Sequence, residues 1–257
     1  DSVDYCTFGN SKPFRIKIRN IVNDNFTYFY VKKTDASRVY GIEFEHMLSP
    51  RNLNFLVNDS SLIEEHIAGI PGDIFIQEYL PKCSEIQKAQ IAKEYVKFNE
   101  RCMIRLLGDM RSYNYVVIPI HDFDQVIYKI RAIDFDQQCF EGKFSVYRPQ
   151  FFKENKPMMD LVKSKLKSDS ITQYKIEERS TISRRLIISD ERIKLLIDIM
   201  KEDTVSIREN VVNLRKEIFK FTNENSFLKC ESMGDLMEKT LIYLKRNYQN
   251  VSLIDLI

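Results

Sequence analysis

Residues 108–114 read GDMRSYN and residues 132–136 read AIDFD, and both segments carry acidic side chains next to apolar runs. In the first segment Asp109 stands five positions before Asn114, and in the second Asp134 ends an apolar run. Carboxylate and amide oxygens are the ligands that hard cations such as Mg²⁺ prefer. We therefore expect Asn114 and Asp134 to share a metal site if the fold brings the two segments together.

The sequence between these segments predicts a β-hairpin. Residues 115–120 and 126–130 are rich in β-branched and aromatic side chains, and the polar, turn-rich stretch 121–125 separates them. The two open ends of a hairpin lie side by side. Such a hairpin would place Asn114 and Asp134 at the same end of its strands.

Upstream segments predict a strand that ends in lysine and then a short helix. Residues 26–33 form a strand-like aromatic run, and residues 38–48 have the pattern of a helix. Each segment offers two candidates for a charged pair between strand and helix. The candidates are Lys32, with Lys33 as the alternate, and Glu43, with Glu45 as the alternate.

A long helix is expected before the first acidic segment. Residues 84–106 predict a long helix, because Ser84 and Gln87 match a capping box and apolar residues follow at helical spacing. Further helices are expected near the C-terminal end, over 190–202, 204–223 and 232–246.

This ordered set resembles the protein-kinase-like superfamily, in which a D-x-x-x-x-N catalytic loop precedes a hairpin and a D-F-G metal-binding segment. The G-D opening and the I-D-F-D ending are closest in style to aminoglycoside- and choline-kinase-type phosphotransferases. The resemblance covers about residues 12–150. It implies an α+β, two-lobed fold, with a small β-rich lobe over residues 1–80 and a larger, mainly helical lobe over 81–257.

The resemblance also implies an ATP- and Mg²⁺-dependent transfer of the γ-phosphoryl group to a hydroxyl. Asp109 would accept or orient that hydroxyl, and Arg111 would offset charge on the moving phosphoryl group. Asn114 and Asp134 would bind Mg²⁺. The acceptor stays open between a small molecule and a protein hydroxyl, and the sequence does not give the oligomeric state.

The nucleotide itself would be held by the N-terminal part of the chain. By resemblance, Lys32 would contact the α- and β-phosphates and would be held by Glu43. The adenine would meet a hinge in the strand 73–80, where Gln77 stands at the gatekeeper position. Backbone groups of three successive residues would make the contacts, namely Glu78, Tyr79 and Leu80.

Several positions depart from the family pattern. Leu107 replaces the usual His, Gly108 stands where Arg often sits, and Asp136 replaces the glycine of D-F-G. The chain has no G-x-G-x-x-G motif, and its one candidate phosphate loop is 8–13. These departures favour a second interpretation, a pseudokinase that serves as a binding or regulatory module without catalysis.

Composition limits the remaining classes of function. The formal net charge of +2 over 257 residues excludes a polyanion binder that relies on bulk charge. The five cysteines and three histidines lack disulfide-framework or zinc-type spacing, and no apolar run reaches membrane-spanning length. We expect a cytoplasmic protein with no membrane partner.

A weaker, third interpretation is nucleic-acid binding through clustered cations, namely Lys163, Lys165, Lys167, Arg184 and Arg185.

Overall fold

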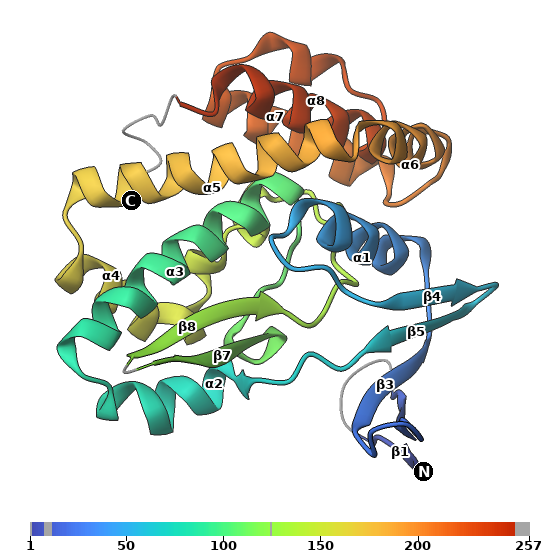
Figure 1. Ribbon diagram of the computed structural model, residues 1–257. Helices are drawn as coiled ribbons and strands as arrows, with labels where there is room; N and C mark the ends of the chain where they lie inside the picture. The colour runs from blue at the N-terminus through green and yellow to red at the C-terminus, as the bar shows by residue number, and fades with distance from the viewer. Residues whose placement is uncertain (1, 8–11, 124, 250–257) are drawn as a thin grey trace.

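The computed structural model describes residues 2–7, 12–123 and 125–249, and it begins with an antiparallel sheet of five strands. The strand order is β1-β2-β3-β5-β4, and helix α1 (Ala36–Leu48) connects β3 to β4 (Figure 1). The predicted strand 26–33 and the predicted helix 38–48 are both confirmed. The strands are β1 (Ser2–Tyr5), β2 (Phe14–Arg19), β3 (Phe26–Lys33), β4 (Phe55–Asn58) and β5 (Ser61–Glu65).

A second antiparallel sheet contains the predicted hairpin. Its order is β6-β7-β8, with β6 (Ile70–Pro71), β7 (Tyr115–Asp122) and β8 (Gln125–Ala132). Tyr115 pairs with Ala132 at the open end of the hairpin. Beyond this pair the backbone N–H of Ile133 donates to the carbonyl of Asn114 at 3.0 Å. The hairpin therefore joins the two acidic segments as expected.

Helix α3 (Glu85–Arg105) lies across the hairpin (Figure 1). The predicted capping box is present, because the Ser84 side chain accepts from the Gln87 backbone and the Gln87 side chain accepts from the Ser84 backbone. The buried face of α3 packs on the hairpin, mainly on β8, and the rings of Phe98 and of Tyr115 in β7 lie 5.1 Å apart. Leu106 ends the helix in the left-handed conformation, with φ of 51°.

The strand predicted over 73–80 is wrong. The chain forms helical turns there, first α2 (Gly72–Ile74), then a π-helical turn (Phe75–Tyr79) and a 3₁₀ turn (Leu80–Lys82). Phe75 is fully buried, and its ring stacks on Tyr79 and packs against Tyr128 of β8. The helical turns place the Phe75 ring against both Tyr79 and the distant Tyr128, which the extended strand expected from the sequence did not anticipate.

The C-terminal part is mainly helical, as predicted. The helix predicted over 190–202 has those bounds, and the one predicted over 232–246 is shifted by one residue. The helix predicted over 204–223 begins four residues later and ends one residue earlier. In Figure 1, α5 runs along α3, α7 and α8 lie over the C-terminal half of α5, and α6 lies beyond its end. The helices are α4 (Lys156–Lys165), α5 (Ser168–Ile188), α6 (Asp190–Glu202), α7 (Arg208–Thr222) and α8 (Met233–Asn247).

Helix α1 takes part in both large hydrophobic clusters of the described chain. Phe44 and Met47 pack into a cluster with buried residues of α5, α6 and α8, whereas Ile42 belongs to a cluster with α3 and the hairpin. The core therefore extends across residue 80, where the sequence suggested a boundary between lobes.

No helix in the described ranges is both long and apolar enough to cross a membrane. All five cysteines are buried and free.

Gly41 sets how closely α1 approaches the second acidic segment. A Cβ at this position would lie 2.7 Å from the carbonyl oxygen of Phe135 and 2.9 Å from its Cβ. We expect Gly41→Ala to lower the free energy of unfolding by about 1–2 kcal/mol, because overpacking costs about 1–3 kcal/mol and helix propensity returns at most about 1 kcal/mol. Urea denaturation measures the change. A gain in stability would show that α1 does not touch this loop.

Candidate functional site

A cavity of about 460 Å³ lies between the five-stranded sheet and the open end of the hairpin. This volume falls within the range of about 300–1,000 Å³ that is typical of small-molecule sites. Strands β3 and β5, helix α1 and both acidic segments contribute to its walls. The charged and amide side chains that line it are Lys32, Arg38, Glu64, Glu65, Asn114, Asp134 and Asp136.

Backbone hydrogen bonds fix the first acidic segment. The N–H of Gly108 donates to the carbonyl of Gln137 at 3.0 Å, and the N–H of Asp109 donates to the carbonyl of Val146 at 3.2 Å. Asp109 has a φ of 55°, a left-handed conformation that Asp tolerates better than most residues. The segment is therefore held by the chain that follows the second acidic segment.

Asp109, Arg111 and Asn114 are linked by hydrogen bonds. Arg111 Nε donates to Asp109 Oδ1 at 2.8 Å, and Asn114 Nδ2 donates to the carbonyl of Asp109 at 2.7 Å. Arg111 also donates to Glu154 at 3.0 Å and lies over the ring of Phe152. Two carboxylates thus engage Arg111. Of this group Asn114 lines the cavity, whereas Asp109 and Arg111 are not among its described lining residues.

Arg38 of α1 bridges the two carboxylates of the second acidic segment. Its guanidinium donates to Asp134 at 3.3 Å and to Asp136 at 3.2 Å, and the Arg38 side chain is 6% exposed. Burial raises the pKa of Asp136 to about 6, and the nearby Asp134 and Asp35 carboxylates add to this rise against the opposing effect of Arg38. One guanidinium therefore serves two carboxylates, and the pair keeps an excess of negative charge.

Lys32 forms its ion pair with Glu64 of β5, not with a glutamate of α1. Tyr30 pairs with Glu64 across the two strands, so Lys32, two residues farther along β3, is its diagonal neighbour on the same face. Both charged side chains are buried, and Glu64 Oε2 has no hydrogen-bond partner among the described residues. The alternate lysine, Lys33, is exposed.

The pairing of Lys32 with Glu43 or Glu45 is therefore wrong. Glu43 accepts from Arg192 of α6 at 2.6 Å. Glu45 is buried and pairs with Arg105 of α3. The physical reason is the packing of α1 on α3 and on the C-terminal helices, which directs both glutamates away from β3.

The expected adenine hinge is also misplaced. The expected contact residues lie in helical turns, namely Glu78, Tyr79 and Leu80, and the Leu80 N–H donates to the Phe75 carbonyl. None of the three, nor Gln77, is among the described residues that line the 460 Å³ cavity. The chain instead crosses between the two sheets over residues 66–69. In that crossing, His66, Ile67 and Gly69 line the cavity. Most of the candidate phosphate loop 8–13 lies outside the described residues.

Arg38 and Glu64 were not predicted from the sequence. No motif marks them, since each is placed by tertiary pairing, Arg38 across to the second acidic segment and Glu64 by the register of β5 on β3. A signal was available for Asp136, because it stands where the family pattern has glycine. That departure introduces the extra carboxylate of the site.

The described side chains contain no cluster of three or more His, Cys, Asp or Glu residues that could hold a metal ion. A metal here would take its protein ligands from Asp134, Asp136 and the amide oxygen of Asn114.

A scan against models of known protein families found no match, and a search of curated proteins found no relative.

The buried pair of Lys32 and Glu64 leads to a prediction about stability. Glu64→Gln leaves Lys32 buried without a counter-charge, which costs about 3–5 kcal/mol of the free energy of unfolding. Glu43→Gln is the matched control, because it removes the more exposed pair with Arg192 and should cost less than about 1 kcal/mol. Urea denaturation compares the two variants. Equal losses would contradict the assigned pairing.

The raised pKa of Asp136 predicts how stability depends on pH. Between pH 4 and pH 6 the folded state holds a proton on Asp136 that the unfolded state has released, so the free energy of unfolding falls as pH rises through this window. We expect Asp136→Asn to show a smaller fall between pH 4.5 and pH 7 than the unmodified protein. Asp198→Asn on exposed α6 is the control. An unchanged pH slope in Asp136→Asn would contradict the crowding of the two carboxylates.

Proposed function

We propose that this chain is an ATP- and Mg²⁺-dependent phosphotransferase of kinase-like fold, which moves the γ-phosphoryl group to a hydroxyl of a small-molecule or protein acceptor. One observation carries the proposal. Lys32, Asn114 and Asp134, chosen from distant segments of the sequence, line the same cavity. The order of sheet, helix, long helix and hairpin is the order that the family resemblance implies, without the expected hinge strand at 73–80.

The residues at the cavity fit a magnesium ion. Among the described residues, the cation paired with Asp134 and Asp136 is Arg38, so a divalent cation would supply the positive charge that the pair lacks. Asn114 donates its amide N–H to Asp109, which leaves the amide oxygen as an acceptor. Mg²⁺ in phosphoryl-transfer sites uses one or two carboxylates together with phosphate oxygens and water. When bound, it neutralises charge on the β- and γ-phosphates.

The side chains of the cavity then have distinct roles. Lys32, kept in place by Glu64, would donate to phosphate oxygens, and residues 66–69 would offer backbone groups to the base. Asp109 would accept the proton of the acceptor hydroxyl or orient it. Arg111 holds Asp109, and a direct contact with the phosphoryl group would require it to leave Glu154.

Nucleotide binding tests the proposal through thermal stability. A ligand at a hundred times its Kd adds about 2.7 kcal/mol to the folded state, which corresponds to a rise in Tm of roughly 5–11 °C for a chain of this size. We expect this rise with ATP and Mg²⁺ together, and its loss in Asp134→Ala. Asp109→Ala should keep the rise and lose phosphoryl transfer. No rise at millimolar nucleotide, or a full rise in Asp134→Ala, would contradict the site.

A pseudokinase is the second candidate, and Arg38 is the observation that favours it. A guanidinium that already bridges Asp134 and Asp136 supplies one positive charge where the metal would bind. This candidate expects nucleotide binding that needs no Mg²⁺ and shows no transfer.

The nucleic-acid interpretation relied on five cations. Two of them already have partners within the fold, because Lys165 pairs with Glu85 and Arg185 donates to carbonyl groups of α1.

A further inference from the structure

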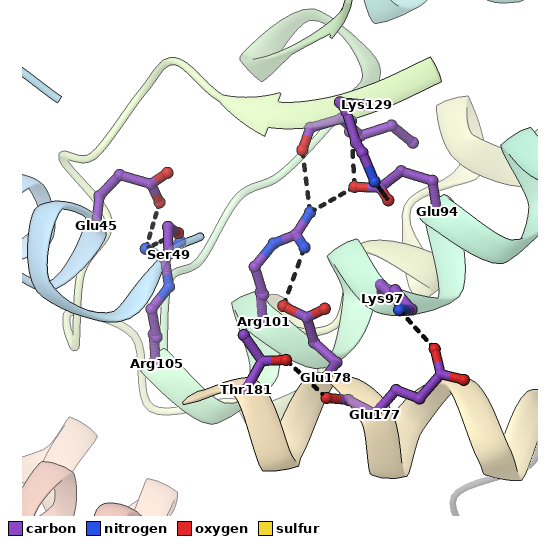
Figure 2. Close-up of polar contacts among 11 residues, drawn as sticks. Glu45, Ser49, Glu94, Lys97, Arg101, Arg105, Lys129, Glu177, Glu178 and Thr181 are labelled. Carbon is purple, nitrogen blue, oxygen red and sulfur yellow. Dashed lines mark hydrogen bonds and ion pairs between the residues drawn. The ribbon is translucent and has the colours of Figure 1, made fainter. Parts of the chain in front are cut away.

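A second cavity, of about 240 Å³, lies beside strand β8 of the hairpin. Helices α1, α3 and α5 and strand β8 form its walls, and Figure 2 shows several of the charged side chains that gather there. Its volume is below the range of about 300–1,000 Å³ for drug-sized ligands. It therefore suits a ligand of few atoms.

The walls of this cavity carry more positive than negative charge. Six lysine and arginine side chains line it, against the three carboxylates of Glu45, Glu94 and Glu178. Glu177, which pairs with Lys97 at 2.7 Å, is a fourth carboxylate beside the lining. The cavity therefore keeps a surplus of two positive charges.

The guanidinium of Arg101 finds acceptors for its N–H donors within the protein. It donates to Glu178, to Glu94 and to the carbonyl of Ile130, each at 3.0 Å (Figure 2). Lys129 adds a contact of 3.3 Å to Glu94. Two carboxylates and a carbonyl thus leave Arg101 without need of a ligand.

Arg105 and Arg131 are not satisfied in this way. Arg105 is 2% exposed and donates to Glu45 and Ser49, but its Nε has no hydrogen-bond partner among the described residues. The Nε of Arg131 is likewise buried without a described partner. Arg131 donates to the carbonyl of Arg51 at 3.3 Å through its terminal guanidinium nitrogen. Both arginines line the cavity, and both pair with the carboxylate of Glu45.

The environment of Arg131 is unfavourable to its charge. Burial lowers the pKa of Arg131, and the guanidinium groups of Arg51 and Arg101 add to this effect against the attraction of Glu45. An anion bound in the cavity would attract the guanidinium charge and so raise the pKa of Arg131 again. Arginine recognises phosphate and carboxylate oxygens through its planar fork of N–H donors.

We propose that this second cavity binds a small phosphate-bearing anion, with Arg105 and Arg131 as its principal donors. The ligand is either inorganic phosphate or the phosphate group of a short ester. The site is separate from the nucleotide cavity and does not depend on the proposed function. Arg131 and Ala132 line it, whereas Ile133 and Asp134 line the nucleotide cavity.

Thermal stability in millimolar phosphate tests the site, with chloride at the same ionic strength as the reference. We expect inorganic phosphate or glycerol phosphate at ten times its Kd to raise Tm by roughly 3–6 °C. The stronger of the two probes identifies the source of the phosphate group. No rise with either probe would overturn the proposal.

Variants locate the bound phosphate. Arg131→Gln should lose most of the rise, whereas Arg192→Gln, which removes an equal charge on exposed α6, should keep it. Arg51→Gln, in an exposed loop at the same cavity, should weaken the rise and provides the test if Arg131→Gln does not fold. Lys32→Gln combined with Glu64→Gln should keep the rise. Loss of the rise in that double variant alone would place the phosphate in the nucleotide cavity and overturn the proposal.

Discussion

The bridge from Arg38 to Asp134 and Asp136 is the interaction on which the candidate site depends. It ties α1 to the segment that follows the hairpin, and Gly41, one turn along the helix, lets the backbone of Phe135 approach. Glu45 lies seven residues after Arg38, about two helical turns, and therefore on the same side of α1. There it holds Arg105 of α3. One face of α1 thus links the hairpin segment to the long helix through charged groups.

The two cavities have opposite electrostatic character. The cavity lined by Asn114 and Asp134 contains two carboxylates that share one guanidinium, which suits a cation. The second cavity contains two arginines that share Glu45, which suits an anion. Successive residues of one chain segment, 131–134, contribute to both. In each case the described protein groups compensate the buried charge incompletely, which makes both cavities candidate binding sites.

Local patterns in the sequence were sufficient for several elements but not for the segment 73–80 or for the pairing between elements. The hairpin, α1 and the capping box of α3 depend on neighbouring residues, and all three were predicted. The segment 73–80 was misassigned because Phe75 packs on Tyr128, a contact between residues far apart in the chain. The partner of Lys32 was misassigned because the register of β5 on β3, which brings Glu64 beside it, leaves no trace in the sequence. Asn114 and Asp134 were placed together correctly because one hairpin connects them.

The central claim is that Asn114 and Asp134 hold a divalent cation at the nucleotide cavity. Anomalous diffraction from crystals grown with Mn²⁺ and a non-hydrolysable ATP analogue tests it most directly, because Mn²⁺ replaces Mg²⁺ at oxygen sites and is located by its own signal. The account predicts an anomalous peak within bonding distance of Asp134 and of the Asn114 amide oxygen, with Arg38 displaced from at least one carboxylate. A nucleotide bound without a peak there, or a peak at another site only, would contradict it.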